Sequence, residues 1–238
     1  MTASFPETIM SAATESPFLA VEHVHKTYQR GEDMVAALTD VTFTLESGCF
    51  AALAGPSGSG KSSLLNIIGT LDRPDAGTVR LAGRMIAYDN PSALEQLRRS
   101  QYGFVFQSFN LLPALTAVEN VELPLFMTSQ PATRRRKRAI ECLSLVGLGD
   151  RLHHYPRQLS GGQQQRVAVA RALVGAPELV LADEPTANLD SATADRLLSL
   201  MGSLNEQYGV GFLFSTHDPR ILDAARTVIR LHDGRFQV

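Results

Sequence analysis

The sequence contains only two cysteines, carries a net charge of −2 and has no long apolar run, and each shortage excludes a class of protein. Cys49 and Cys142 make neither a disulfide framework nor a metal-binding spacing, so the chain suits a reducing compartment. The small charge gives no general attraction to nucleic acid or acidic lipid, and we expect no nucleic-acid partner. No stretch reaches the roughly 18 apolar residues that span a bilayer.

The first 17 residues are also poor in features. They contain no Lys or Arg and no long apolar core, so they are not typical of a signal peptide. We predict a flexible N-terminal tail at residues 1–17, followed by a single domain at 18–238 of a soluble, cytoplasmic protein. With 44% hydrophobic and 19% charged residues, that domain can bury a sizeable core.

Hydrophobic patterning predicts an α/β fold. Because strand and helix patterns alternate, the strands should form a parallel sheet with crossover helices. The helical stretch within 114–176 is long enough to form a lobe of its own. Further helices are expected at 61–71 and 191–209, and strands at 18–28, 36–48, 49–54, 77–83, 102–107, 178–184 and 209–216.

Two glycine-rich helix starts stand out in the sequence. The first, GPSGSGKS at 55–62, follows a strand expected to be buried and precedes a helix, which is the setting of a phosphate-binding P-loop. Its backbone amides should close on the β-phosphate of a nucleotide, Lys61 should neutralise β- and γ-oxygens, and the Ser62 hydroxyl should ligate Mg²⁺. The residues expected at the nucleotide are Gly55, Pro56, Ser57, Gly58, Ser59, Gly60, Lys61, Ser62 and Ser63.

Polar side chains at the ends of other predicted strands suit the same chemistry. In LVLADEP, Asp183 is placed to hold Mg²⁺ through water, and Glu184 can accept a proton from the attacking water. Gln107 suits a neighbour of water and Mg²⁺, and His217 can reach a γ-phosphate or orient the water. Alone, either would be an ordinary strand-end residue. We expect Glu184, His217, Gln107 and Lys61 to be catalytic, with Ser62, Gln107 and Asp183 at the metal.

The second glycine-rich start is LSGGQ at 159–163, which opens a predicted helix. A helix start with so little side chain leaves its backbone amides bare, and these are suited to hold an anion. If this start faces away from the P-loop of its own chain, two copies related by a two-fold axis can each complete the other's ATP site. We therefore predict a dimer in which the partner's nucleotide is contacted by Ser160, Gly161, Gly162 and Gln163.

Three smaller features leave alternatives open. Tyr28 either stacks on an adenine or is a core residue. The basic run at 134–138 is either a solvated helix start or a contact for headgroups or a partner. His23 and His25 would share one face of a strand, but no third ligand for a metal lies nearby in the sequence.

Together these motifs resemble the ATP-binding subunit of ABC transporters over residues 18–236. GPSGSGKS is similar to the Walker A motif, LVLADE to Walker B and LSGGQ to the family signature. Gln107 matches the Q-loop, His217 the switch histidine and Tyr28 the aromatic residue of the A-loop. NLD, ending at Asp190, matches the D-loop, which adds Asp190 to the expected nucleotide contacts.

The resemblance implies an ATP-hydrolysing subunit that uses ATP and Mg²⁺ and acts as a homodimer. It also implies a P-loop NTPase fold with a RecA-like core at 18–107 and 177–238, an N-terminal antiparallel β subdomain and a helical signature subdomain at about 108–176. Segments such as GFVFQSFNLLPALTAVENVELPL look like the lipoprotein-releasing and macrolide-efflux subclass. Ala187 departs from that subclass, which usually has glycine before NLD.

Members of that subclass pair with permeases of the FtsX/MacB-like class, which have four transmembrane helices and a large extracytoplasmic domain. The resemblance thus implies a peripheral position on the cytoplasmic face of the inner membrane, driving export, extraction or transmission of motion. The apolar Phe109, Leu111 and Leu112 either line a groove for a permease helix or pack within the helical lobe. A cell-division-type regulator with a similar permease and a soluble non-transport ABC ATPase are the alternatives. Substrate recognition would reside in the permease.

Overall fold

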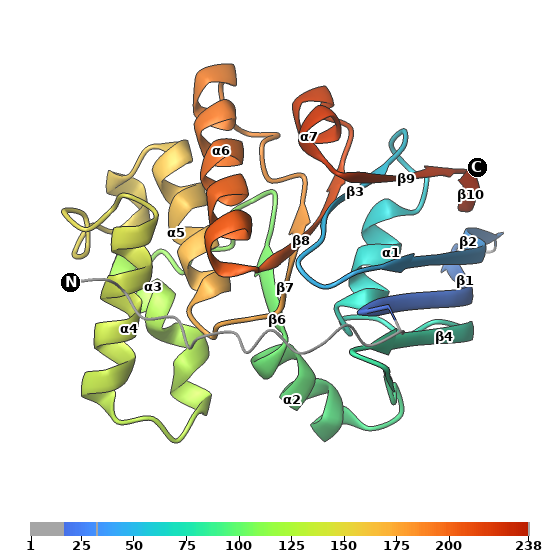
Figure 1. The fold of residues 1–238 in the computed structure, drawn as a ribbon, viewed down its shortest axis with the longest axis horizontal. Coiled ribbons are helices and arrows are strands. Elements are labelled where there is room, and N and C mark those ends of the chain that lie inside the picture. Colours follow the sequence, from blue (N-terminus) through green and yellow to red (C-terminus); the bar gives the residue numbers. More distant parts are fainter. Residues whose placement is uncertain (1–16, 32, 238) are drawn as a thin grey trace.

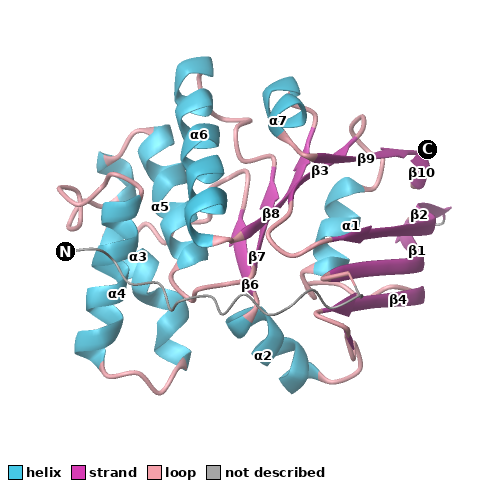
Figure 2. Ribbon diagram, in the orientation of Figure 1, coloured by secondary structure: helices cyan, strands magenta, loops and turns pink. Residues whose placement is uncertain are grey.

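Two β-sheets stand side by side in the structure, a computed structural model that describes residues 17–31 and 33–237 (Figure 1 and Figure 2). The larger sheet has the order β10-β9-β3-β8-β7-β6, and its neighbouring strands are parallel except for β9 and β10. This arrangement confirms the predicted α/β class. Its strands are β3 (Phe50–Ala54), β6 (Tyr102–Val105), β7 (Leu179–Asp183), β8 (Gly211–Thr216), β9 (Thr227–His232) and β10 (Arg235–Gln237). The tail predicted at 1–17 lies outside the described residues except for Pro17.

The smaller sheet is antiparallel, as predicted, with the order β2-β1-β4-β5. A bulge interrupts β1 between Val21 and Val24, and there His23 has a φ of +51° and places its Nδ1 2.7 Å from Asp40 Oδ1. The described part of the chain contains no group of three His, Cys, Asp or Glu that could hold a metal ion, so His23 and His25 gain no third ligand. The strands are β1 (Leu19–Arg30), β2 (Asp33–Leu45), β4 (Ala76–Leu81) and β5 (Arg84–Met85).

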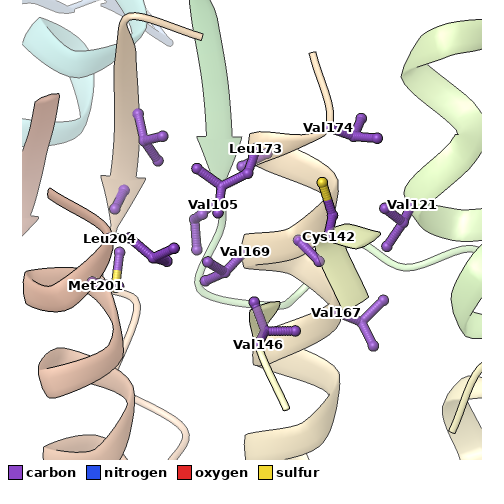
Figure 3. Close-up of a cluster of buried hydrophobic side chains, with 14 of the residues drawn as sticks. Val105, Val121, Cys142, Val146, Val167, Val169, Leu173, Val174, Met201 and Leu204 are labelled. Carbon is purple, nitrogen blue, oxygen red and sulfur yellow. The ribbon is translucent and has the colours of Figure 1, made fainter. Parts of the chain in front are cut away.

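Helices cover both faces of the parallel sheet. Alternate residues of β3 enter two cores, Phe50 and Ala52 on the face of α5 and α6, and Ala51 and Leu53 on the face of α1. Valine and leucine side chains fill the junction of α4, α5 and α6 with β6 (Figure 3). The helices are α1 (Lys61–Ile68), α2 (Pro91–Ser100), α3 (Ala117–Glu122), α4 (Ala132–Leu145), α5 (Gly161–Leu173), α6 (Ser191–Tyr208) and α7 (Pro219–Ala224), with the 3₁₀ helices η1 (Leu123–Met127) and η2 (Pro156–Gln158).

Sequence patterning missed the short strands β5, β9 and β10 and the helices α2 and α7. Each residue of α2 is exposed or half-buried, and its apolar face consists of Leu94 and Leu97, which pack against the core but give only a short periodic signal. Its start does carry a signal, because the Asn90 side chain accepts a hydrogen bond from the Ala93 amide and Pro91 occupies the first helical position. That pair of residues would have located α2.

Five consecutive cations, residues 134–138, lie in the first turns of α4. Arg135 and Arg136 both pair with the buried carboxylate of Glu122, at Nε–O distances of 3.6 and 3.2 Å. The Arg135 guanidinium also lies 4.7 Å from the ring centroid of Phe126. Two of the five cations thus hold α4 against the end of α3, and the run is only in part the solvated helix start that the sequence suggests.

Candidate functional site

The P-loop joins β3 to α1, and close packing dictates two of its glycines. Gly55 has a φ of +155°, and a Cβ there would lie 2.2 Å from the carbonyl oxygen of Leu231. Gly60 has a φ of +99°, and its Cβ would lie 2.4 Å from the carbonyl oxygen of Ala37. Within the described chain no side chain caps α1 at Gly60, so the first amides of the helix are open to an anion.

Lys61, the first residue of α1, points back into the loop. Its Nζ donates hydrogen bonds to the carbonyl oxygens of Gly55 at 2.8 Å and Pro56 at 2.9 Å, and the residue is buried. The ammonium is therefore fixed beside the open amides of the loop. Together they form a concentrated positive site for phosphate oxygens.

A cavity of about 420 Å³ opens beside the P-loop and gathers most of the predicted site. Ser62 Oγ donates to Asp183 Oδ1 at 3.1 Å, which brings two expected metal ligands together. Hydroxyl and carboxylate oxygens are the donors that Mg²⁺ prefers, so this pair fits the ion. Ser59 is buried. The predicted residues that line the cavity are Ser57, Gly58, Gly60, Lys61, Ser62 and Ser63 with Gln107, Glu184 and His217.

Glu184 directly follows β7, and its carboxylate is fixed by Thr216, the last residue of β8, and by the next residue, His217. His217 Nδ1 lies 2.7 Å from one carboxylate oxygen, and Thr216 Oγ1 donates to the other at 3.1 Å. Glu184 has a φ of +43°, which is uncommon for a residue other than glycine, and its amide donates to the Ser215 carbonyl at 2.8 Å. The side chain of Glu184 is 15% exposed and that of His217 is 73% exposed. The carboxylate is held in the cavity wall, while the imidazole is open to solvent.

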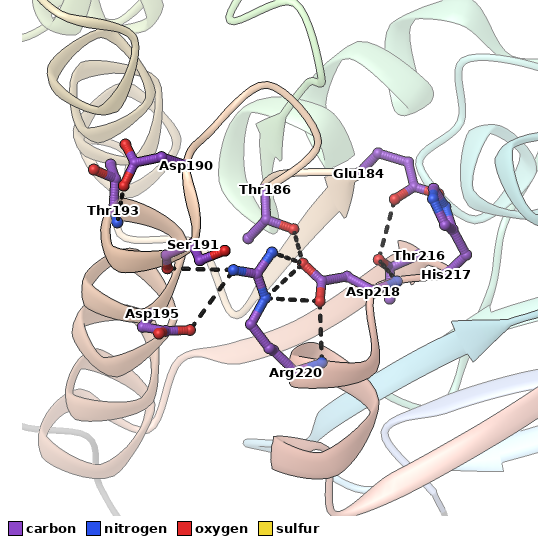
Figure 4. Close-up of polar contacts among 10 residues, drawn as sticks. All are labelled: Glu184, Thr186, Asp190, Ser191, Thr193, Asp195, Thr216, His217, Asp218 and Arg220. Atoms are coloured by element: carbon purple, nitrogen blue, oxygen red, sulfur yellow. Dashed lines mark hydrogen bonds and ion pairs between the residues drawn. The ribbon is translucent and has the colours of Figure 1, made fainter.

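A polar network that the sequence did not reveal lies next to His217 (Figure 4). Asp218 Oδ2 accepts hydrogen bonds from Thr186 Oγ1 at 2.6 Å and from the Arg220 guanidinium at 2.7 Å. Arg220 Nη1 also donates to the Ser191 carbonyl at 3.2 Å. The hydrogen bonds from Arg220, opposed by burial and joined by the one from Thr186, lower the pKa of Asp218 to about 2. The network ties the loop of His217 to the start of α6.

The segment after Gln107 is held from two sides. Asn188 Nδ2 donates to the Gln107 carbonyl at 2.9 Å. Arg171 of α5 donates to the carbonyl oxygens of Phe109 at 2.8 Å and Asn110 at 2.5 Å. Because Phe109 and Asn110 have φ values of +61° and +49°, the chain turns sharply between these two anchors. Asn188 and Arg171 thus join this segment to the loop before α6 and to α5.

A second cavity, of about 430 Å³, lies beside the same segment, for whose apolar residues the sequence left open a groove or packing within the lobe. Leu111 packs against the core, Leu112 is exposed, and Phe109 lies against Gly161. None of these three is among the described residues that line the cavity, because the left-handed turn directs the chain back toward α5. The lining includes Leu71, Phe104, Phe106, Asn110 and Met127.

The LSGGQ motif opens α5 away from the P-loop cavity, whose described lining contains no residue of this motif. Ser160 Oγ accepts from the Gln163 amide at 3.3 Å, and Gln163 Oε1 accepts from the Ser160 amide at 2.9 Å. A capping box therefore uses the amides of Ser160 and Gln163, so the helix start is bare only at Gly161 and Gly162 and not throughout, as the sequence suggests. A Cβ on Gly161 has room, with its nearest atom at 3.7 Å, whereas one on Gly162 would lie 2.2 Å from Thr193 Cγ2.

Tyr28 and Asp190 are both exposed. Tyr28 of β1 pairs with Val35 of β2, and Val35 lines the P-loop cavity. With 37% of its surface exposed, Tyr28 is not a core residue. Asp190 caps α6 by accepting from the Thr193 amide at 3.0 Å, and hydrogen bonding to Thr193 lowers the pKa of this carboxyl. Both side chains are accessible to a nucleotide or a partner.

Residues 38–187, more than half of the chain, match the family model described as ABC transporter. The chain belongs to this family. An uncharacterized ABC transporter ATP-binding protein of Thermotoga maritima is 50% identical over 214 residues, which cover 90% of this chain and 91% of the relative. The macrolide export ATP-binding/permease protein MacB 1/2 of Paracoccus denitrificans is 46% identical over 225 residues, which cover 94% of this chain and 34% of the relative.

A solved structure agrees with this ABC fold. The dimeric post-hydrolysis state of the ATP-binding cassette MJ0796 of Methanocaldococcus jannaschii, bound to ADP and Pi, has a TM-score of 0.84 at 44% identity and covers 92% of this chain and 97% of that one. The comparisons confirm an ATP-hydrolysing ABC ATPase related to macrolide-export proteins. Over the residues that the structure describes, no helix has the length and apolarity to cross a membrane.

Proposed function

We propose that this ABC ATPase works as a head-to-tail homodimer, in which the P-loop of one copy and the LSGGQ motif of the other hold the same ATP. One observation carries the proposal: α1 and α5 begin at the two motifs but lie on opposite faces of the parallel sheet. Two anion-binding helix starts that do not converge within one chain can converge across a two-fold axis. The dimeric MJ0796 cassette with ADP and Pi supports this arrangement.

In the proposed site the P-loop binds the triphosphate. Amides of the loop from Gly55 to Ser63 surround the β-phosphate, and Lys61 Nζ exchanges its carbonyl partners for phosphate oxygens. Ser62 and Asp183, with Gln107, would hold Mg²⁺, which neutralises charge on the phosphates during transfer.

Glu184 is the proposed general base of hydrolysis. Its carboxylate faces the cavity and accepts a proton from the water that attacks the γ-phosphate. His217 and Thr216 hold this carboxylate in place, and His217 is exposed enough to reach the γ-phosphate as well. Gln107 contacts the same water. Four residues of the LSGGQ motif would cover the other side of the γ-phosphate: the partner's Ser160, the partner's Gly161, the partner's Gly162 and the partner's Gln163. The partner's Asp190 would lie beside them.

We further propose that the cassette drives a permease of the FtsX/MacB-like class from the cytoplasmic face of the inner membrane. The MacB relative is named as an ATP-binding and permease protein in one chain, which supports this partner. The cavity that includes Phe106 and Met127 is the proposed docking surface, because it adjoins the segment that Arg171 and Asn188 anchor. A movement of the permease that displaces the segment after Gln107 would therefore be transmitted to the ATP site. The proposed helical subdomain at about 108–176 contains α3, α4 and α5, and the rest of 18–238 is the RecA-like core.

Met127→Glu should lower binding to the permease about tenfold or more, because it replaces one of the exposed apolar side chains of the docking surface by a charge. Met127 is 67% exposed, so the variant should fold and keep its basal ATPase activity. The measurement is the fraction of purified chain that sediments with inner-membrane vesicles from the source cells. Met85→Glu is the matched control, since Met85 is 60% exposed on β5, outside the cavity. Equal sedimentation of the two variants would show that the permease does not dock at this cavity.

A further inference from the structure

The ring of Tyr28, which we expect to stack on the adenine of ATP, is tied to two neighbours. Its hydroxyl donates to Asp72 Oδ2 at 2.7 Å. Lys26 Nζ lies 5.1 Å from the centroid of the ring and donates to Asp72 Oδ1 at 2.8 Å and to the Arg73 carbonyl at 2.8 Å. One carboxylate thus binds the hydroxyl and the ammonium at once, and the three side chains close a triangle.

Burial and charge make this triangle rigid. Lys26 is only 7% exposed, which a lysine tolerates when its charge is paired. Burial alone would raise the pKa of Asp72, but hydrogen bonds from Lys26 and Tyr28 lower it, so the carboxylate stays ionised. Burial and the hydrogen bond to Asp72 raise the pKa of Tyr28, so its hydroxyl stays a donor. Each member keeps the charge state that the contact needs.

The triangle also reaches the P-loop helix. Asp72 lies in the turn that follows α1, and its amide donates to the carbonyl of Asn66 in that helix at 3.2 Å. The same helix begins at Lys61, in the phosphate site. A continuous path of hydrogen bonds and helix backbone therefore runs from the phosphate-binding residues to the ring on β1.

We propose that Asp72 and Lys26 are positioning residues for the nucleotide base, which fix the ring of Tyr28 at a set place relative to the P-loop. Neither needs to touch the nucleotide. Lys26 covers one face of the ring, and the exposed part of the ring is the surface left for a base. A ring that is already ordered loses little rotamer freedom when the base binds, so the tether contributes affinity by preorganisation. The inference rests on the proposed function and on the expectation from the sequence that the base of ATP lies at Tyr28.

Two variants remove the tether, which is the contact between the Tyr28 hydroxyl and Asp72, and both keep an aromatic ring at position 28. Tyr28→Phe removes only the hydroxyl, and Asp72→Ala removes the shared acceptor. Each should raise the Kd and KM for ATP about 3- to 10-fold and leave kcat within about twofold. The double variant should bind ATP no more weakly than Asp72→Ala alone, because that variant has already lost the Tyr28–Asp72 contact. Affinity for inorganic tripolyphosphate, which has no base, should stay at the wild-type value. Asp150→Asn, at an exposed aspartate of the helical lobe, is the control.

Tyr28→Ala distinguishes failure of this inference from failure of the base assignment. If Tyr28→Ala binds ATP as the wild type does, the base does not lie at Tyr28, and both the assignment and the tether are wrong. If Tyr28→Ala weakens ATP binding but Tyr28→Phe and Asp72→Ala do not, the assignment stands and the tether is overturned. Additive losses in the double variant overturn the tether too, because they show that the two side chains act independently. An equal loss of tripolyphosphate affinity also overturns it, because that loss indicates a distorted α1.

Discussion

Glu184→Gln should hydrolyse ATP about 10²- to 10⁴-fold more slowly than the wild type, with unchanged affinity for ATP. The amide has the size of the carboxylate but cannot accept a proton from the attacking water. In the proposed site Lys61 of α1 and the amides of the P-loop hold the phosphates, and the substitution touches neither. Single-turnover release of Pi measures the chemical step, and titration with a fluorescent ATP analogue measures binding.

The Glu184→Gln variant should also accumulate as an ATP-bound dimer, because in the proposed dimer ATP stays in both shared sites when hydrolysis is blocked. Glu206→Gln is the matched control, since Glu206 is an exposed glutamate of α6 whose charge serves no proposed step. Wild-type turnover by Glu184→Gln would show that another group takes the proton. The comparison of Glu184→Gln with Glu206→Gln requires that the control bind ATP with normal affinity.

Gly161→Asp should reduce ATP hydrolysis at least about 100-fold and abolish the ATP-dependent dimer, while the monomer still binds ATP. A carboxylate at the start of α5 repels the γ-phosphate that the proposed dimer places there. The fold should be intact, because a Cβ at Gly161 meets no atom nearer than 3.7 Å and an acidic residue suits the first turn of a helix. Light scattering with and without ATP measures the dimer.

Gly161→Ala is the control for this variant, since it adds the same Cβ without the charge. It should keep most of the activity. Gly162 is unsuitable for the test, because its Cβ would run into Thr193 of the same chain and disturb the start of α6. If Gly161→Asp hydrolyses ATP and dimerises like Gly161→Ala, no phosphate docks at this helix start.

The chemical groups around the nucleotide could be predicted because few other uses fit them. Few structural roles require a glycine-rich loop with a lysine, or two acids at the end of an apolar strand. The structure brings Ser62 and Asp183, which are 121 positions apart in the sequence, to hydrogen-bond distance. The parallel sheet explains this, since the carboxyl ends of its strands meet at one edge. The roles of these residues stay predictions.

The residues that hold the site in place could not be predicted in the same way. Asn188 meets Gln107 across 81 positions, and Tyr28 meets Asp72 across 44. Asparagine, aspartate and tyrosine have many ordinary uses on a protein surface, so their type carries no signal. Which of them meet depends on strand order and loop path, and no sequence pattern specifies either.

Local geometry accounts for two more differences between expectation and structure. The start of α5 was expected to be bare, but Ser160 and Gln163 have the spacing of a capping box, which the sequence did display. Phe109, Leu111 and Leu112 were expected either to line a groove or to pack within the lobe; the left-handed turn at Phe109 redirects the chain, and Leu111 packs on the core. A residue other than glycine in that conformation has no reliable sequence signal.

The shared ATP site is tested most directly by mixing two inactive variants, Lys61→Ala and Gly161→Asp, with the permease present if the free subunit dimerises poorly. In a mixed dimer one site carries both defects and the other carries neither. The account predicts that an equal mixture recovers about a quarter of the wild-type ATPase rate, because random pairing gives half mixed dimers with one intact site each. ATP-dependent dimerisation is followed in parallel. If mixed dimers form and single-site turnover is possible, but activity never exceeds that of the separate variants, each chain hydrolyses its own ATP and the shared site is wrong.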